Sequence, residues 1–181
     1  KASIGTTDPI FDGDVDAGLV ISASRESDAG DVSQGGDYFE GMKVNLVVSL
    51  GSVPDVSGKS VEDATAILAE KGLVAQEGDR VFSDSFADGT VIKSSPSKDG
   101  PVHAGDAITL TISKGPDVVE VPTVVTGQSV ATARKQLEDL GFKVTSNVPQ
   151  FLEGAVIASK QDPTAGTKIK RGSSISVNYV P

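Results

Sequence analysis

The sequence predicts an α+β fold, a linear array of small repeats in which one helix packs on a small antiparallel sheet of about three strands. Two observations support this prediction. Similar segments recur about 68 residues apart, and each copy has a stretch of helical periodicity followed by a stretch of strict alternation. A repeat of about 60 residues buries little apolar surface, so stacking on its neighbours would stabilise it.

The repeats are visible at both ends of the copies. Residues 53–56, Val-Pro-Asp-Val, recur at 121–124 as Val-Pro-Thr-Val, and a Gly-led alternating segment at 105–112 recurs at 172–179. A further copy of the back half lies within 18–51, without a helical front half. We therefore expect a truncated first repeat with an insertion near 36–41, followed by two complete repeats, with boundaries at 1–52, 53–116 and 117–181.

The front half of each complete repeat predicts one helix of about three turns. In the second repeat, Ser60 is the expected N-cap, since its hydroxyl can accept a hydrogen bond from a free helix N–H group. Val61, Ala64 and Leu68 then lie on one face, and Gly72 provides the left-handed stop. The third repeat has the same pattern at Ser129, Val130, Ala133, Leu137 and Gly141.

The back half of each repeat predicts strands. Ile108, Leu110 and Ile112 alternate with polar residues, which is typical of a strand with one buried face. We expect partner strands at Val91-Ile92 and at Val156-Ile157, with turn-rich segments between the strands.

Composition excludes several classes of function. The formal net charge of −9 is too acidic for a general nucleic-acid binder, and the absence of Cys removes thiolate nucleophiles and cysteine zinc sites. The apolar runs are far shorter than the roughly 18 residues of a membrane span, so we expect no membrane insertion by this chain. A start at Lys1 suggests that a membrane anchor lies upstream.

No catalytic constellation is visible, and we expect neither an enzyme nor a cofactor. His103 is the only imidazole, and no Ser or Asp pattern frames it as a triad member, so we interpret it as an exposed loop histidine. The acidic run 12–18 could gather oxygen ligands for calcium, but it has Ala17 and Ala23 where the EF-hand template needs Gly and Glu. A solvated acidic loop is the favoured interpretation, and a cation site is the alternative.

The ordered set of motifs in the two complete repeats resembles the PASTA domain. These motifs are Val-Pro-x-Val, Ser-Val-x-x-Ala, a Gly after the helix, Val-Ile, Pro-x-x-Gly, and the alternating segment before Ser113-Lys114-Gly115. The resemblance covers 53–181 in full and 18–52 in the back half. The chain departs from the family pattern at the 36–41 insertion and at 94–96, where Ser-Ser-Pro replaces the Gln-Asp-Pro of 161–163.

The resemblance implies a helix against a three-stranded sheet and an extracellular, cell-wall-facing location, attached through an upstream transmembrane helix. It also implies binding to peptidoglycan fragments (muropeptides), or to β-lactams that mimic the stem peptide. The tandem arrangement favours the sensor region of a membrane-anchored bacterial Ser/Thr kinase, whose receptors would associate with one another. The alternatives are the tail of a penicillin-binding protein and a spacer that binds nothing.

The third repeat is the best suited to such an anionic ligand. It has seven basic and six acidic residues, whereas the first repeat has three and nine. Stem peptides carry carboxylates, for which Arg offers a bidentate fork and Lys a point charge. The candidate ligand-binding residues are Arg171, Lys170, Lys168, Arg134, Lys160 and Gln161, and the alternative for them is a solvated turn.

Two aromatic residues in the first-repeat insertion are further candidates. Tyr38 and Phe39 could stack on a sugar ring, although packing between repeats is the favoured interpretation.

Overall fold

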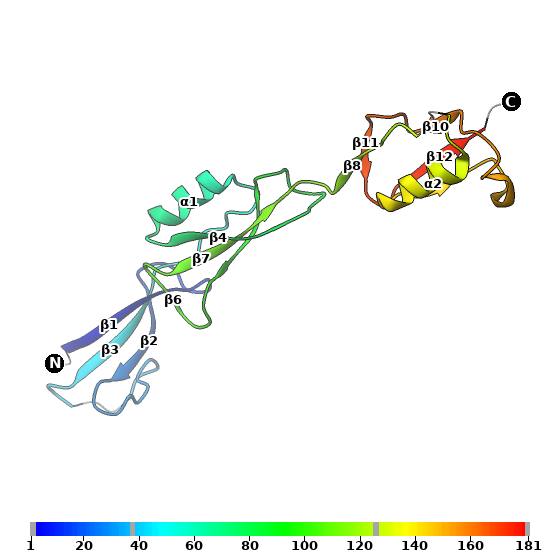
Figure 1. The fold of residues 1–181 in the computed structure, drawn as a ribbon. Helices are drawn as coiled ribbons and strands as arrows, with labels where there is room; N and C mark the ends of the chain where they lie inside the picture. Colours follow the sequence, from blue (N-terminus) through cyan, green and yellow to red (C-terminus); the bar gives the residue numbers. More distant parts are fainter. Residues whose placement is uncertain (1–2, 37–38, 125–126, 180–181) are drawn as a thin grey trace. The chain divides into compact units, whose positions relative to one another are not determined.

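A computed structural model describes residues 3–36, 39–124 and 127–179, and Tyr38 lies outside them. The chain divides into two compact units (Figure 1). Unit 1 comprises residues 1–81 and 86–115, and unit 2 comprises residues 82–85 and 116–181. Neither helix of the described ranges is long and apolar enough to cross a membrane. The three repeat boundaries drawn from the sequence stay a prediction.

The first repeat is a sheet. Strands β1 (Ser3–Phe11), β2 (Val20–Arg25) and β3 (Lys43–Ser49) form it, with β3 central, parallel to β1 and antiparallel to β2. The described residues before Ser49 contain no helix, which agrees with the expected absence of a helical front half.

The second repeat completes unit 1. Its elements are α1 (Val61–Glu70), β4 (Val74–Val81), β5 (Val91–Pro96), β6 (Val102–His103) and β7 (Ala107–Ser113). The hydroxyl of Ser60 accepts a hydrogen bond from the Asp63 N–H at 3.0 Å, and Gly72 ends the helix at a φ of 74°. The expected helix is therefore confirmed at both ends.

The third repeat makes up most of unit 2 and repeats the same plan, with shorter strands in its three-stranded sheet. They are β8 (Val118–Glu120), α2 (Val130–Asp139), β9 (Lys143–Thr145), the 3₁₀ turn η1 (Gln150–Leu152), β10 (Lys160–Asp162), β11 (Lys168–Lys170) and β12 (Ser174–Asn178). The expected strand at Val156-Ile157 is wrong, because β10 begins only at Lys160. Ile157 instead forms an isolated bridge with the helix cap Ser129.

The α+β class is confirmed, but the sheets are mixed rather than antiparallel throughout. In the order β4-β7-β5, β7 pairs in parallel with β4 and antiparallel with β5, and β9, β12 and β10 repeat this arrangement. The two flanking strands of each sheet thus run in opposite directions, and the central strand runs in the direction of the strand that follows the helix.

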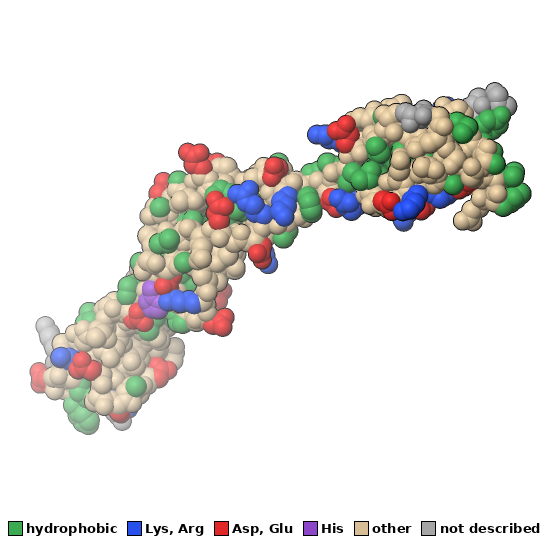
Figure 2. Space-filling model, viewed as in Figure 1, with side chains coloured by type: hydrophobic (Ala, Val, Ile, Leu, Met, Phe, Trp, Pro, Cys, Tyr) green, Lys and Arg blue, Asp and Glu red, His purple; other side chains and the backbone are tan. Residues whose placement is uncertain are grey.

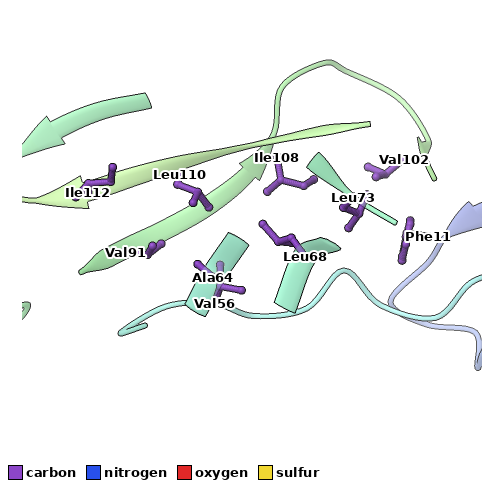
Figure 3. Packing of buried hydrophobic residues seen from close by; sticks show 10 residues of the cluster. All are labelled: Phe11, Val56, Ala64, Leu68, Leu73, Val91, Val102, Ile108, Leu110 and Ile112. Carbon is purple, nitrogen blue, oxygen red and sulfur yellow. The ribbon is translucent and has the colours of Figure 1, made fainter. Parts of the chain in front are cut away.

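The core of unit 1 extends from the second repeat into the first. Leu68 of α1 packs with Ile108 and Leu110 of β7, and all three side chains are fully buried (Figure 3). Phe11, at the end of β1, joins the same cluster beside Val102. A separate cluster around Leu137, Phe142 and Ile175 forms the core of unit 2.

Backbone pairing joins the first two repeats. Ile10 and Phe11 of β1 pair with His103 and Val102 of β6, and the His103 imidazole Nε2 lies 3.1 Å from Asp8 Oδ1. His103 is therefore half-buried in a strand pair, which corrects the expected exposed loop histidine, since β1 supplies a partner that the sequence did not indicate.

Candidate functional site

Lys168 and Lys170 lie on one exposed face of β11. Side chains two residues apart in a strand project on the same side, and the intervening Ile169 is half-buried against the core of unit 2. The strand pairs with β8, so Lys168 lies opposite Glu120. Lys170 Nζ lies 2.7 Å from Asp84 Oδ2 of the same unit, with both side chains more than half exposed. The two predicted lysines are therefore accessible on one face of β11, each near an acidic residue, and we call this pair the β11 strip.

Arg171 follows Lys170 in the sequence, but its guanidinium makes hydrogen bonds within unit 2. Its Nε donates to Asp117 Oδ2 at 3.1 Å, and its Nη1 donates to the Leu140 carbonyl at 3.0 Å. Leu140 is the C-cap of α2, where the helix dipole favours a cation. The guanidinium thus closes the end of the helix, while the side chain stays about half exposed to solvent.

Arg134 is bound inside the fold. Its guanidinium donates two hydrogen bonds to the Glu153 carboxylate, one of them at 2.8 Å, and another from Nη1 to the Val144 carbonyl at 2.8 Å. Glu153, just after η1, has a side chain that is only 3% exposed. The hydrogen bond from Arg134 lowers the pKa of Glu153, and the same contact raises the pKa of Arg134. This pair was missed in the sequence, because only the fold brings two residues 19 positions apart together.

The stability of the third repeat should fall in acid because of Glu153. Its lowered pKa means that the stabilisation is fully present above the ordinary value of 4.5 and is lost as pH falls through the folded value. We expect urea midpoints, read from third-repeat amide signals at pH 7, 5, 4 and 3, to drop below about pH 4.5. Glu153→Gln should flatten this decline, and an unchanged slope would contradict the assignment. Among the described residues, the other carboxyls with a lowered pKa are those of Asp28, Asp31, Asp55 and Asp106, all in unit 1.

The remaining two candidates lie on β10. Lys160 is exposed and pairs along the backbone with Asn178 of β12. Gln161 is only 7% exposed, and its carboxamide bonds to backbone groups of 122–124. Gln161 therefore has a structural role in attaching residues 122–124 to β10, whereas the side chain of Lys160 is accessible to a ligand.

The structure gives little support to a cation site in the acidic run 12–18 or to packing of Phe39 between repeats. In the acidic run, Asp12 Oδ1 accepts hydrogen bonds from the N–H groups of Asp14 and Val15. The described residues contain no cluster of three His, Cys, Asp or Glu side chains suited to a metal ion. Phe39 is 75% exposed, so it does not pack between repeats as expected. On the face shown in Figure 2, Lys and Arg side chains are interspersed with Asp and Glu, without a large patch of either sign.

Comparison with known families places this fold. A family model described as "PASTA domain" matches residues 51–114 and 119–180, which is more than half of the chain. The chain belongs to the PASTA family. The PASTA repeats, rather than a protein kinase domain, account for these matched ranges.

Relatives that share these PASTA repeats include several named as kinases. A "probable serine/threonine-protein kinase" of Corynebacterium efficiens is 36% identical over 95% of this chain, and the kinase PknB of Corynebacterium glutamicum, also named as probable, is 33% identical over 91%. The chain spans about a quarter of the length of each relative, 25% in both cases. A solved three-PASTA-domain structure of a Ser/Thr kinase from Staphylococcus aureus covers 98% of this chain at 22% identity, with 87% of that chain covered and a TM-score of 0.49.

Proposed function

We propose that these PASTA repeats form the extracellular, wall-facing sensor region of a membrane-anchored Ser/Thr kinase, and that they bind peptidoglycan fragments. The observation that carries the proposal is the match of nearly the whole chain to a region of proteins named as Ser/Thr kinases. Binding would gather receptors and raise the local concentration of kinase domains that phosphorylate one another.

The β11 strip is the surface best suited to the carboxylates of a stem peptide. Lys168 and Lys170 present two ammonium groups on one side of a strand, about 7 Å apart along the backbone. Each ammonium is a point charge that can follow a mobile ligand. Arg134, Arg171 and Gln161 direct their polar groups to partners in the same repeat, and so they do not extend the strip. An exposed site of this kind should bind modestly, with a Kd of about 1 μM to 1 mM.

The paired variant Lys168→Gln/Lys170→Gln should weaken muropeptide binding at least about tenfold, since both cations on the strip are lost while the strand keeps its length. The measurement is an NMR titration of the isotope-labelled chain with defined muropeptides, following amide shifts. Lys135→Gln is the matched control, because Lys135 is an exposed cation of the same repeat, on α2. Saturable shifts that survive the paired variant would overturn the assignment to the strip. Flat spectra for the wild type up to millimolar ligand would favour the spacer alternative.

A further inference from the structure

The turn between β9 and β10 exposes an aromatic side chain in a segment without charge. Phe151 of η1 is 84% exposed, and the adjacent Leu152 is 42% exposed. Residues 146–152 contain no charged side chain, whereas the corresponding turns of the first and second repeats, 12–17 and 83–88, both carry aspartates. Figure 2 shows hydrophobic side chains where Figure 1 draws this turn in orange. The third repeat therefore presents an uncharged apolar surface at a place where the other repeats are acidic.

Side-chain contacts hold both ends of this turn. At one end, the carboxamide of Asn147 accepts a hydrogen bond from the Tyr179 N–H at 2.9 Å and donates one to the Tyr179 carbonyl at 2.9 Å. At the other end, the buried carboxylate of Glu153 is held by the guanidinium of Arg134 on α2. The segment between Asn147 and Glu153 is therefore fixed to the body of the third repeat.

This fixed turn is suited to binding. Single exposed hydrophobic residues are common on protein surfaces and by themselves indicate nothing. Here, however, the exposed residues lie between two points of attachment, and within η1 the Leu152 N–H donates to the Pro149 carbonyl at 2.8 Å. A surface that is already ordered avoids much of the loss of conformational freedom that weakens binding to a mobile loop. Phe151 can therefore meet a ligand at little entropic cost.

The size of the surface favours a small ligand. A phenylalanine side chain buries about 150–250 Å², whereas a stable protein–protein interface needs roughly 800 Å² from each partner. Phe151 and Leu152 together fall well short of that area. A second copy of the chain or another protein would therefore need contacts beyond this turn.

The chemistry of the surface favours a neutral sugar. The absence of charge in 146–152 gives no attraction to a carboxylate or an ammonium group. Beside Phe151, the carboxamide of Gln150 is exposed and makes no hydrogen bond to another described residue, so it can bond to a hydroxyl group. An aromatic ring carries partial negative charge on its face, which attracts the slightly positive C–H hydrogens on the apolar side of a pyranose. A ring beside an available amide matches both kinds of group that a sugar presents.

We propose that Phe151 is a stacking platform for one pyranose ring of a neutral glycan, with Gln150 bonding to hydroxyl groups at the edge of the sugar. The inference rests on the proposed function and deepens it. The turn at η1 binds the glycan part of a peptidoglycan fragment, whereas the β11 strip binds the carboxylates of the stem peptide.

The test is an NMR titration of the isotope-labelled 181-residue chain with tri-N-acetylchitotriose, a neutral glycan that carries no peptide. We expect saturable shifts of the amide signals of 147–153 and upfield shifts of the sugar protons that lie over the Phe151 ring. Phe151→Ala should weaken binding about tenfold, because the buried ring supplies most of the contact, and Phe151→Tyr should retain it. Phe39→Ala is the matched control, since Phe39 is 75% exposed but lies in the first repeat, and it should bind like the wild type.

The proposal is overturned if the signals of 147–153 do not respond, if Phe151→Ala binds like the wild type, or if Phe39→Ala weakens binding equally. Broadening of these signals with rising protein concentration, without sugar and absent from Phe151→Ala, would assign the turn to contact between two copies instead. A parallel titration with a muropeptide separates this inference from the proposed function. Shifts at β11 without shifts at the turn would support the strip and exclude the platform, whereas glycan shifts at the turn without muropeptide shifts at β11 would support the platform and contradict the strip.

Discussion

Replacing Arg134 by methionine is expected to lower the free energy of unfolding of the third repeat by about 2–4 kcal/mol. Loss of one partner of a fully buried ion pair costs ~3–5 kcal/mol, because the other charge stays buried without compensation. The cost here should be lower, since Arg134 is 24% exposed whereas Glu153 is 3% exposed. Methionine keeps most of the apolar stem, so the loss reports the charge and its hydrogen bonds.

Urea unfolding followed through the amide signals of α2 and β12 measures this loss. Lys135→Met is the matched control, because Lys135 is the next residue on the same helix and pairs with Asp139 in solvent at 78% and 66% exposure. An exposed pair of this kind contributes ~0.5 kcal/mol or less. The double variant Arg134→Met/Glu153→Leu should recover most of the stability, since it leaves no buried charge. Equal losses for Arg134→Met and Lys135→Met would contradict the structural role of the pair.

The elements that local sequence determines could be predicted from it. Ser60 and Gly72 mark both ends of α1, because capping and a left-handed stop depend on residues within one turn. The alternation of residues 108–112 likewise identified the central strand β7. The parallel pairing of β4 with β7 was not predicted, since alternation is the same in parallel and antiparallel sheets.

The candidate site, too, could be predicted from the sequence only in part. The sequence identified a basic cluster, but it could not separate Lys168 and Lys170 on the exposed face from Arg171, whose contact with Leu140 depends on where α2 ends. No feature of the local sequence marked Glu153 as a buried residue, because its partner Arg134 is brought to it only by the fold. The difference between Ser94 and Gln161 was visible in the sequence, but the hydrogen bonds of Gln161 to the backbone were not.

Leu68→Ala is expected to destabilise unit 1 by about 2–5 kcal/mol, the usual cost of a large-to-small change at a fully buried leucine. The loss should extend beyond the second repeat. Among the described residues of the first repeat only Phe11 and Ser49 are buried, so its sheet has no core of its own. Phe11 instead packs in the cluster that contains Leu68.

Amide hydrogen exchange of the intact chain measures how far the effect extends. We expect faster exchange in Leu68→Ala both for β7 and for the paired residues of β1 and β3, because opening the shared core loosens the packing of Phe11 that anchors the first sheet. Leu137→Ala is the matched control, since Leu137 occupies the corresponding helix position in the separate core of unit 2. It should accelerate exchange in α2 and β12 and leave β1–β3 unchanged. Wild-type protection of β3 in Leu68→Ala, alongside loss of protection in β7, would show that the first repeat folds without the core of the second.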